Sequence, residues 1–336
     1  MENKIKVIGA GLICIDIIQS GLSSIVMNGG SCANVLSVLS QVGYDCCVIR
    51  EQYKGPLEEL LSNTLRSLGV NSAFYKKANT PPPCVIELLT KQKHTFSTSC
   101  PSCGKKILSL HLPTVSNIRP FIDKLSSAAV FYCDRTSSGI RAMMKIVHES
   151  NGLIVYEPNS ARNQKTLIET AAQADIVKCS KERIQEGIAE LLRVTCDNKL
   201  VIVTDGDRGL SFSHRTSEGL MSPWITIPSS FEKPVVDSSG AGDWLTAGFI
   251  AELLKKQPFS ITEILCDRTG IIELIKKGMK YSELCCTTVG AQGAFYLPKY
   301  GNEISNLSSQ IIENPNFTEQ NSLNSLPCPY CNSSLL

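Results

Sequence analysis

Short apolar runs alternate with longer amphipathic stretches through the middle of the chain. The apolar runs are residues 128–133, 153–157, 174–178 and 200–204. Between them, apolar side chains recur at helical spacing in residues 138–149, 163–172 and 181–192. Strands that alternate with helices form parallel sheets, because each crossover helix covers one face of the sheet. The pattern therefore predicts an α/β fold, a three-layer doubly wound and mostly parallel sheet.

The N-terminal part adds elements to this pattern. Ile5–Gly9 is predicted to be a strand, which Leu12–Asp16 continues after a glycine break. Cys46–Ile49 is predicted to be a buried strand. An amphipathic helix is expected at Pro56–Leu68, because its apolar spacing stops just before Gly69.

The pattern changes from about residue 75 to residue 112. Residues 84–89 and 94–98 have strand composition and flank a short polar turn. Two such runs around a turn predict a β-hairpin that interrupts the alternation of strands and helices.

The stretch 235–249 holds the most distinctive motif. Val235 and Val236 are expected to end a strand, and an apolar surface at helical spacing begins at Trp244. Gly240, Ala241 and Gly242 should therefore lie at the N-terminus of a largely buried helix. Unpaired amides and the helix dipole favour an anion there, and glycine lets it approach the backbone.

Asp243 follows directly, in the first turn of this helix. The dipole stabilises a carboxylate there by ~0.3–1 kcal/mol, which is sufficient reason for an acidic residue. A carboxylate beside an anion cradle can also take a proton from a hydroxyl while the cradle holds a phosphoryl group. These residues alone leave both interpretations open.

Composition narrows the class of protein. The 336 residues are 43% hydrophobic and 19% charged, with a net charge of +2, which gives no support for nucleic-acid binding through a basic surface. The apolar run 7–18 is interrupted and too short to span a bilayer, and it lacks the layout of a signal peptide. We therefore expect a cytoplasmic protein without a membrane partner, in which most of the 15 cysteines are reduced and buried.

The residues from Asp237 to Asp243 read D-S-S-G-A-G-D. This run resembles the D-T-x-G-A-G-D signature of the ribokinase-like (PfkB) carbohydrate kinases, with Ser238 in place of threonine. The resemblance implies that Asp243 is the catalytic base. It also implies that Gly240, Ala241 and Gly242 form the anion hole for the transferred phosphoryl group.

Further stretches resemble elements of the substrate side of this family. Asp16 ends the N-terminal strand segment, residues 29–34 resemble the G-G-x-x-x-N element, and residues 157–162 resemble D-P-N-x-R. The hairpin is similar to the β lid of fructokinase-like members, with the lid at about residues 12–30 and 75–112. The substrate contacts implied are Asp16, Gly29, Gly30, Asn34, Asn159 and Arg162.

Other stretches resemble the nucleotide side. Residues 204–209 are similar to T-x-G-x-x-G, and residues 290–291 to the G-A loop near the adenine. The resemblance implies ATP with Mg²⁺, and a monovalent cation near Asp237. The nucleotide-side residues implied are Ser180, Thr204, Gly206, Gly209, Asp237, Ser238, Gly290 and Ala291.

One position departs from the family pattern. Arg183 stands where the N-x-x-E element has a glutamate that organises the magnesium waters, and Glu182 lies one residue early. An arginine cannot replace a metal-ordering carboxylate, although it can contact phosphate.

Two C-P-x-C pairs stand apart from the kinase pattern. Cys100 and Cys103 follow the hairpin, whereas Cys328 and Cys331 lie in a C-terminal tail, residues 301–336, after a kinase domain at 1–300. Each pair resembles a zinc knuckle, so we expect all four thiolates to bind one structural Zn²⁺ that holds the tail beside the lid. A disulfide-exchange pair and a zinc site shared between subunits remain alternatives.

The function expected from the sequence is phosphorylation of a hydroxyl of a small sugar or sugar-like metabolite by ATP. Nucleoside phosphorylation is the alternative within the same class. A non-catalytic ligand-binding or scaffold protein, which meets a partner through its zinc-held tail, is the alternative from another class. An exposed edge strand of the lid is also expected to allow a homodimer.

Overall fold

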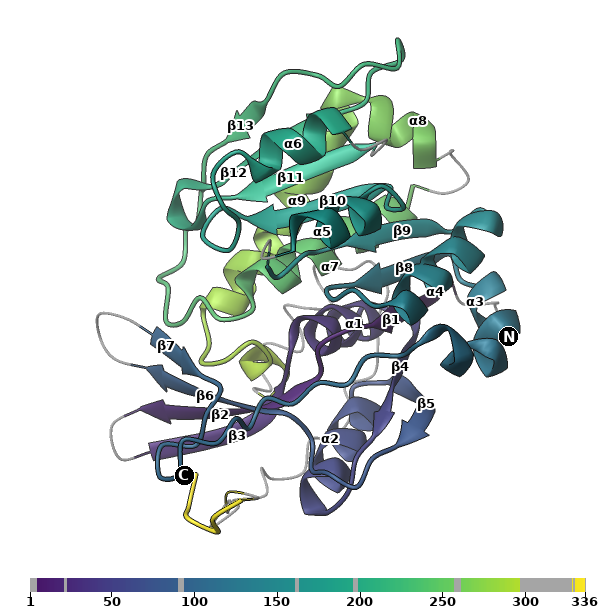
Figure 1. The fold of residues 1–336 in the computed structure, drawn as a ribbon. Helices are drawn as coiled ribbons and strands as arrows, with labels where there is room; N and C mark the ends of the chain where they lie inside the picture. Colours follow the sequence, from purple (N-terminus) through teal and green to yellow (C-terminus); the bar gives the residue numbers. More distant parts are fainter. Residues whose placement is uncertain are drawn as a thin grey trace.

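The computed structural model describes residues 5–20, 23–89, 94–160, 163–195, 199–256, 261–296, 328 and 330–335. A central sheet with helices on both faces makes up the body, and a smaller sheet projects from one side (Figure 1). Among the described helices, none combines the length and apolarity needed to cross a bilayer. The predicted fold class is confirmed.

Nine strands form the large sheet, in the order β13-β12-β11-β10-β9-β8-β1-β4-β5, and all pairs are parallel except those of β12 and β13. Their bounds are β1 (Lys6–Ala10), β4 (Asp45–Gln52), β5 (Val70–Lys77), β8 (Val130–Cys133), β9 (Leu153–Tyr156), β10 (Ile176–Ser180), β11 (Leu200–Thr204), β12 (Leu210–His214) and β13 (Ile225–Ile227).

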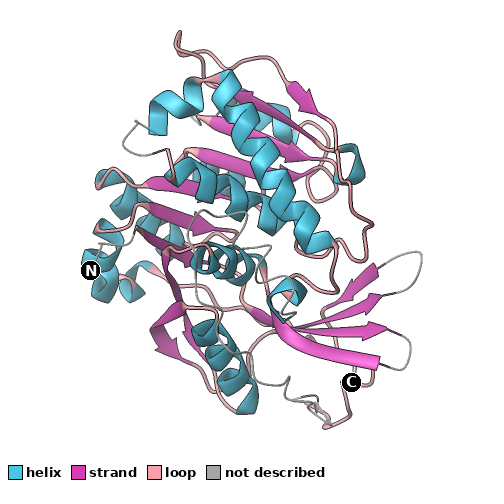
Figure 2. Ribbon diagram, turned by 180° about the vertical axis from the view of Figure 1, so that it is seen from behind, coloured by secondary structure: helices cyan, strands magenta, loops and turns pink. Residues whose placement is uncertain are grey.

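The second sheet, called the lid sheet below, has the strand order β3-β2-β6-β7. Its strands are β2 (Cys14–Ser20), β3 (Ser23–Gly29), β6 (Cys84–Leu89) and β7 (His94–Ser97). β6 and β7 are the two strands predicted from the hairpin pattern. Figure 2 shows the lid sheet splayed away from the body, with the C-terminus beside it.

The helices cover the two faces of the large sheet. Their bounds are α1 (Ser31–Gln41), α2 (Pro56–Ser67), α3 (Ile122–Ser126), α4 (Ser138–Glu149), α5 (Gln164–Ala171), α6 (Ile188–Thr195), α7 (Ala241–Leu254), α8 (Ile261–Cys266) and α9 (Arg268–Cys286). Short 3₁₀ turns lie at Val115–Asn117, Arg119–Phe121, Gly206–Arg208 and Gly293–Tyr296.

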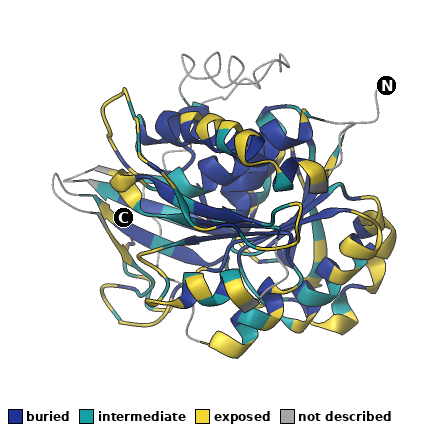
Figure 3. Ribbon diagram, turned by 90° about the horizontal axis from the view of Figure 1, so that it is seen from above, coloured by how far each residue is buried: buried dark blue, intermediate teal, exposed yellow. Residues whose placement is uncertain are grey.

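Alternating side chains of the strands pack into two separate hydrophobic cores, one on each face of the large sheet. Val7 and Val130 pack in a core with α1, α2, α7 and α9, whereas their neighbours Ile8 and Phe131 pack in a core with α3 to α6. Successive strand side chains point to opposite faces, so a strand covered on both sides is apolar throughout. Figure 3 shows the buried strands between helices whose outer sides are exposed.

Helix α7 lies at the centre of one helical layer. Every residue from Asp243 to Leu254 is buried, which confirms the predicted buried helix. A Cβ on Gly248 would lie 2.6 Å from the ring of Tyr281, so glycine lets α7 and α9 pack closely. The indole of Trp244 stacks on Phe295 at a centroid distance of 5.1 Å. The first turn of α7 is therefore held in place by packing on several sides.

The chain changes sheets directly after β1, so the prediction that Leu12–Asp16 continues the first strand is wrong. β1 ends at Ala10, and β2 begins in the lid sheet at Cys14. Between them the Leu12 amide donates to Asp134 Oδ1 at 2.8 Å. A Cβ on Gly11 would lie 1.7 Å from that oxygen, so only glycine lets the backbone pass Asp134 here.

Two other local predictions are wrong. Val235 and Val236 end no strand; both are more than half exposed, and the Val236 amide donates to the Cys286 carbonyl at 2.7 Å. Residues 181–187 form turns rather than the start of a helix, because Gly187 has a φ of +83° and α6 begins only at Ile188.

Candidate active site

The carboxyl ends of the parallel strands meet the N-terminus of α7. Ligands in open α/β sheets collect at these ends, because the loops there leave a crevice. Gly240 caps α7 with a φ of +77°, and a Cβ on it would lie 2.3 Å from Cβ of Ala291. The amides in the first turn of a helix have no acceptor within the helix. Gly240, Ala241 and Gly242 thus present a glycine-lined helix start suited to an anion.

Asp243 points its carboxylate into a polar chain of side chains. Asn34, on α1, donates from Nδ2 to Asp243 Oδ2 at 2.7 Å, and Gln292 Nε2 donates to Asn34 Oδ1 at 3.1 Å. These bonds orient one carboxylate oxygen. Burial raises the pKa of Asp243, and the negative charge of Glu157 adds to this, while the bond from Asn34 and the charge of Lys178 act in the opposite direction. A carboxylate with a raised pKa is a stronger proton acceptor.

A buried ion pair lies beside Gly242. Lys178 Nζ, from the middle of β10, is 2.5 Å from Glu157 Oε1, and both side chains are almost fully buried. Glu157 Oε2 also accepts from Thr246 at 3.0 Å and from Tyr132 at 3.3 Å. A Cβ on Gly242 would lie 3.3 Å from Lys178 Nζ. The ammonium group is therefore next to the helix start proposed to receive the anion.

Lys178→Met should lower the free energy of unfolding by about 3–5 kcal/mol, because it leaves the buried Glu157 charge without a counter-charge. Urea denaturation measures this loss. The matched control is Lys181→Met, since Lys181 Nζ makes a similar 2.9 Å pair with Asp205 but is 64% exposed. The control should cost less than about 1 kcal/mol. Equal losses of unfolding free energy in the two variants would show that the buried Lys178–Glu157 pair contributes no more to stability than the exposed pair.

Asp16 approaches the same region from the lid sheet. It lies on β2, and a Cβ on Gly29 would lie 1.8 Å from Asp16 Oδ2, so Gly29 leaves the space that this carboxylate fills. Gly30 has a φ of +92°, and a Cβ on it would lie 2.5 Å from the Leu12 carbonyl. Gly29 is therefore required by the Asp16 carboxylate, and Gly30 by the close approach of the Leu12 backbone.

The lid sheet also contacts the loop before α7. The Ser239 hydroxyl donates to Oε1 of Glu87, a buried residue of β6. Burial raises the pKa of Asp16 to about 7, and the charges of Glu87, Asp243 and Asp237 add to this effect. Carboxylates from the lid sheet and from α7 thus lie close enough to influence one another.

We expect the stability of the protein to fall as the pH rises from about 4 to about 7. The pKa of Asp16 is about 7 in the folded protein but near 3.8 ordinarily, so in this window only the folded state retains its proton. The free energy of unfolding then decreases by up to about 1.4 kcal/mol per pH unit for this group. Asp134, whose pKa burial raises to about 6, acts with the same sign.

Urea denaturation of the wild type and of Asp16→Asn at several pH values tests this dependence. The free energy of unfolding of Asp16→Asn should decrease less steeply with pH. The variant lacks the carboxyl group whose proton only the folded state retains in this window. A decline as steep in Asp16→Asn as in the wild type would exclude Asp16 as a contributor.

The residues expected on the nucleotide side lie at the ends of neighbouring strands. Ser180 and Thr204 are paired across β10 and β11, and both are partly exposed. Gly206 and Gly209 bound the turn that follows, with φ values of +57° and +99°. A Cβ on Gly209 would lie 2.2 Å from the Ile227 carbonyl, whereas Gly206 faces open space. The carboxyl ends of β10 and β11 are therefore partly exposed, and the turn after β11 depends on two glycines with positive φ.

Asp237 links the loop before α7 to the loop after α9. Its Oδ1 accepts from the Ser239 amide at 2.9 Å, and its Oδ2 accepts from the Gly290 amide at 2.8 Å. Gly290 has a φ of +74° and packs against Met27 of the lid sheet. Ala291 accepts the indole N–H of Trp244 on its carbonyl at 2.6 Å. The nucleotide-side motifs at 237–238 and 290–291 are therefore adjacent, and Ser238 itself is exposed.

Asp134 and Arg135 form part of the site, although the sequence reasoning missed them. Asp134 directly follows β8 and is buried, with Oδ2 2.6 Å from Arg135 Nη1. Its pKa is raised by burial, with a further contribution from Asp243. The available signal was its position, an acidic residue at the carboxyl end of a predicted parallel strand.

Three other expected or flagged positions have different surroundings. Asn159 is exposed just beyond β9, and Arg162 lies outside the described residues. Arg183 is exposed, yet its charge lowers the pKa of Asp243, so it lies near the carboxylate.

The four cysteines of the two C-P-x-C pairs come together away from this region. The sulfur atoms of Cys100, Cys103, Cys328 and Cys331 all lie within 4.8 Å of one another. They lie beside the lid sheet rather than at the carboxyl ends of the large sheet.

Comparisons with known proteins agree with this geometry. A family model described as pfkB family carbohydrate kinase matches residues 26–299. Among curated proteins, no sequence relative matches the chain.

Solved structures share the fold at low sequence identity. A fructokinase with bound ATP from Xylella fastidiosa has a TM-score of 0.72 and 17% identity, covering 91% of this chain and 99% of its own. A ribokinase from Giardia lamblia has a TM-score of 0.70 and 14% identity, covering 89% and 99%. An adenosine kinase from Schistosoma mansoni, in complex with 2-fluoroadenosine, has a TM-score of 0.68 and 16% identity, covering 85% and 96%.

The family model spans most of the chain, including the glycine-rich start of α7 and the loop that Asp237 ties to it. The chain therefore belongs to the PfkB family of carbohydrate kinases.

Proposed function

We propose that this kinase transfers the γ-phosphoryl group of ATP to a hydroxyl of a small sugar or sugar-like metabolite. The observation that carries the proposal is the position of Asp243, a buried carboxylate in the first turn of α7 directly after the Gly240–Gly242 amides. Phosphoryl transfer depends mainly on positioning and on stabilisation of charge, and this arrangement provides a base and an anion site side by side.

Asp243 acts as the base in this proposal. Asn34 engages Oδ2, which leaves Oδ1 for the acceptor hydroxyl. As the acceptor oxygen bonds to the γ-phosphorus, its proton passes to Asp243 and the bond to the ADP oxygen breaks. The raised pKa of Asp243 suits this proton transfer.

The phosphoryl group rests against the start of α7. The helix dipole and the first-turn amides stabilise its negative charge, and Gly242 leaves room for close approach. Lys178 Nζ lies next to that space, and the exposed Arg183 adds a second positive charge near Asp243.

Magnesium enters this proposal as part of the ATP complex. Mg²⁺ is held by carboxylates, water and phosphate oxygens, and Glu157 and Asp243 are the carboxylates beside Gly242. Position 183, where the family has a metal-ordering glutamate, holds an arginine here and cannot serve as a ligand. Thr204, Gly206 and Gly209 would line the nucleotide side of the site, and the magnesium complex of ATP would supply charge neutralisation at the transferred phosphate.

The acceptor lies between α7 and the lid sheet in this proposal. Asp16, Gly29, Gly30 and Asn34 line the approach from the lid side, and Asn159 stands at the end of β9. Asp134 and Arg135 add a carboxylate and a guanidinium that can bind hydroxyls. A lid that covers the acceptor excludes water, which limits hydrolysis of ATP.

Two expectations about partners stay predictions. A monovalent cation is proposed near Asp237, and a homodimer through the lid, for which β3 and β7 provide the edge strands of the lid sheet.

A nucleoside is the alternative acceptor, because the adenosine kinase from Schistosoma mansoni shares this fold to a similar degree as the fructokinase. ADP formation measured over a panel of sugars and nucleosides, with magnesium and ATP, separates the two classes. Turnover with sugars supports the proposal, and turnover with nucleosides alone overturns it. ATP binding without turnover of any acceptor would favour the scaffold alternative.

A further inference from the structure

The two C-P-x-C segments have the same backbone turn. In the first, the Cys100 amide donates to the Lys105 carbonyl at 2.9 Å, and the Gly104 amide donates to the Cys100 carbonyl at 2.9 Å. In the second, the Cys328 amide donates to the Ser333 carbonyl at 2.7 Å, and the Asn332 amide donates to the Cys328 carbonyl at 3.0 Å.

The fifth residue of each segment adopts the left-handed conformation. Gly104 has a φ of +69° and Asn332 a φ of +58°, and these are the residue types that tolerate this region best. Two segments more than 220 residues apart therefore repeat one turn, in which both cysteines point to the same side.

The sulfur atoms are paired crosswise between the two turns. Cys100 Sγ lies 3.9 Å from Cys331 Sγ, and Cys103 Sγ lies 3.9 Å from Cys328 Sγ. In a tetrahedral site with Zn–S bonds of about 2.3 Å, two sulfurs are separated by about 3.8 Å. A disulfide would need about 2.05 Å, so the observed spacing fits a shared metal ion rather than a bond between sulfurs.

We propose that Cys100, Cys103, Cys328 and Cys331 bind one Zn²⁺ within a single chain. Four thiolates complete a tetrahedral shell and leave no open position, so the ion is structural and takes no part in phosphoryl transfer. Cys100 and Cys328 are buried, whereas Cys103 and Cys331 are partly exposed.

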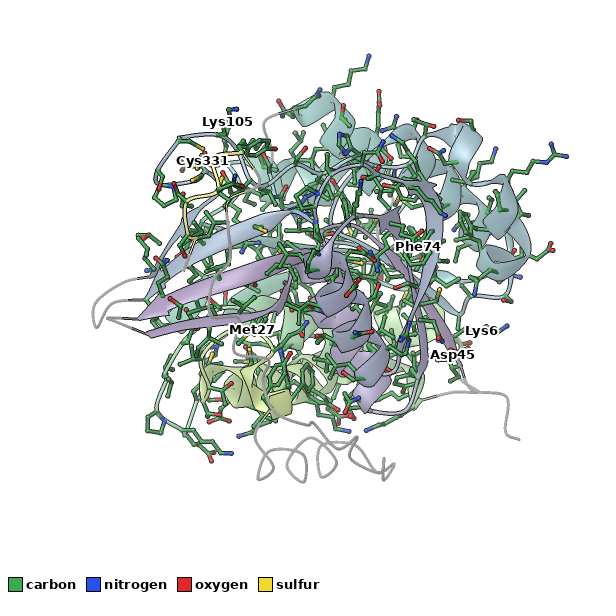
Figure 4. The ribbon with its side chains drawn as sticks, turned by 90° about the horizontal axis from the view of Figure 1, so that it is seen from below. Lys6, Met27, Asp45, Phe74, Lys105 and Cys331 are labelled. Carbon is green, nitrogen blue, oxygen red and sulfur yellow. The ribbon has the colours of Figure 1, made fainter. Side chains whose placement is uncertain are left out.

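The zinc site joins the C-terminal segment to the lid sheet. Gln19 Nε2, on β2, donates to the Leu335 carbonyl at 3.0 Å, and the Leu335 side chain is buried. Lys105 Nζ lies 5.3 Å from the centre of the Tyr330 ring, and Figure 4 shows Lys105 and Cys331 as neighbours.

The first turn also adjoins β6, because the Ile107 carbonyl accepts from the Cys84 amide at 3.0 Å. The ion therefore holds Cys328 and residues 330–335 against the strands that carry Asp16 and Glu87. If the proposed function is correct, zinc also keeps the lid side of the acceptor site in place.

Metal analysis of the purified full-length protein tests the site without reference to activity. The wild type should contain about one zinc per chain, and the double variant Cys328→Ser/Cys331→Ser should contain none. Cys266→Ser is the matched control, because Cys266 is a partly exposed cysteine outside the cluster, and it should retain the zinc. Iron in place of zinc, half a zinc per chain, or metal-free disulfides would each overturn the proposal.

Hydrogen exchange on the wild-type protein, before and after zinc removal with a chelator, tests the attachment. Peptides covering 98–108 and 330–335 should exchange faster without zinc and recover when zinc is restored, while peptides of α4 should not change. Unchanged exchange in 330–335 would show that the metal does not hold this segment. Because this readout is independent of turnover, failure of the kinase proposal would leave it unaffected.

Discussion

Asp243→Asn should lower kcat roughly 10²–10⁴-fold, which is the usual contribution of a positioned general base. The substitution keeps an oxygen that can accept the hydrogen bond from Asn34, so the polar chain through Gln292 can persist. What it removes is the proton acceptor. Steady-state kinetics with the best acceptor from the panel measures the loss, and calorimetry with ATP should show that nucleotide binding is retained.

A carboxylate elsewhere on the same helix provides the control for this variant. Glu252, also buried on α7, pairs with Lys255 and Lys277 on the side away from the glycine motif. Glu252→Gln should cost stability but leave kcat per folded molecule unchanged. Wild-type kcat in Asp243→Asn, or equal losses in the two variants, would contradict the assignment of Asp243 as the base.

The two glycines of the anion site should respond differently to alanine. Gly240→Ala forces a Cβ into the left-handed region and to within 2.3 Å of Cβ of Ala291, so both backbone and packing oppose it. We expect a loss of about 2–4 kcal/mol in the free energy of unfolding, the sum of these two penalties. Urea denaturation should show this loss, and activity should fall with it.

Gly242→Ala separates the chemistry from the fold. Its φ is not in the left-handed region, and its Cβ would lie 3.3 Å from Lys178 Nζ and 4.0 Å from Glu157 Oε1, so only a small shift of this ion pair is needed. Stability should therefore change by less than about 1 kcal/mol. The added methyl group would nevertheless fill the space next to the first-turn amides, and we expect kcat to fall about 10²-fold, as when one donor to a developing charge is lost.

The comparison between the two variants is decisive for the anion site. If Gly242→Ala were both stable and fully active, catalysis would not depend on close approach of the phosphoryl group to the backbone at this position. A loss of activity without a loss of stability would place the reacting group at the start of α7.

The buried carboxylates of the body and those of the lid sheet differ in the charges that lie beside them. In the body, the Lys178–Glu157 pair neutralises the buried region next to Gly242. In the lid sheet, the pKa of Asp16 is raised to about 7 by burial, with a further contribution from the charge of Glu87. A bound ligand with hydroxyl donors would stabilise the ionised form of Asp16, so acceptor binding and ionisation of this residue should be coupled.

Much of the fold was determined by local sequence patterns. Helix α4 has the bounds Ser138–Glu149 that its apolar spacing predicts, and β11 has the bounds Leu200–Thr204 of its apolar run. These elements are readable because each carries its own periodicity and its own end signals, such as the Ser137 cap on α4. The glycine start of α7 was equally readable, since Gly240 to Asp243 are contiguous and need no distant partner to form the motif.

Only the tertiary structure decided how distant residues meet. The switch between sheets at Gly11 depends on Asp134, more than a hundred residues later, and the orientation of Asp243 depends on Asn34 and Gln292. No local pattern encodes such contacts, because they arise when packed layers bring loops from separate strands to one edge of a sheet. The four cysteines combine both sources: two C-P-x-C pairs predicted a shared site, and the packing of the C-terminal segment on the lid sheet brought their sulfur atoms together.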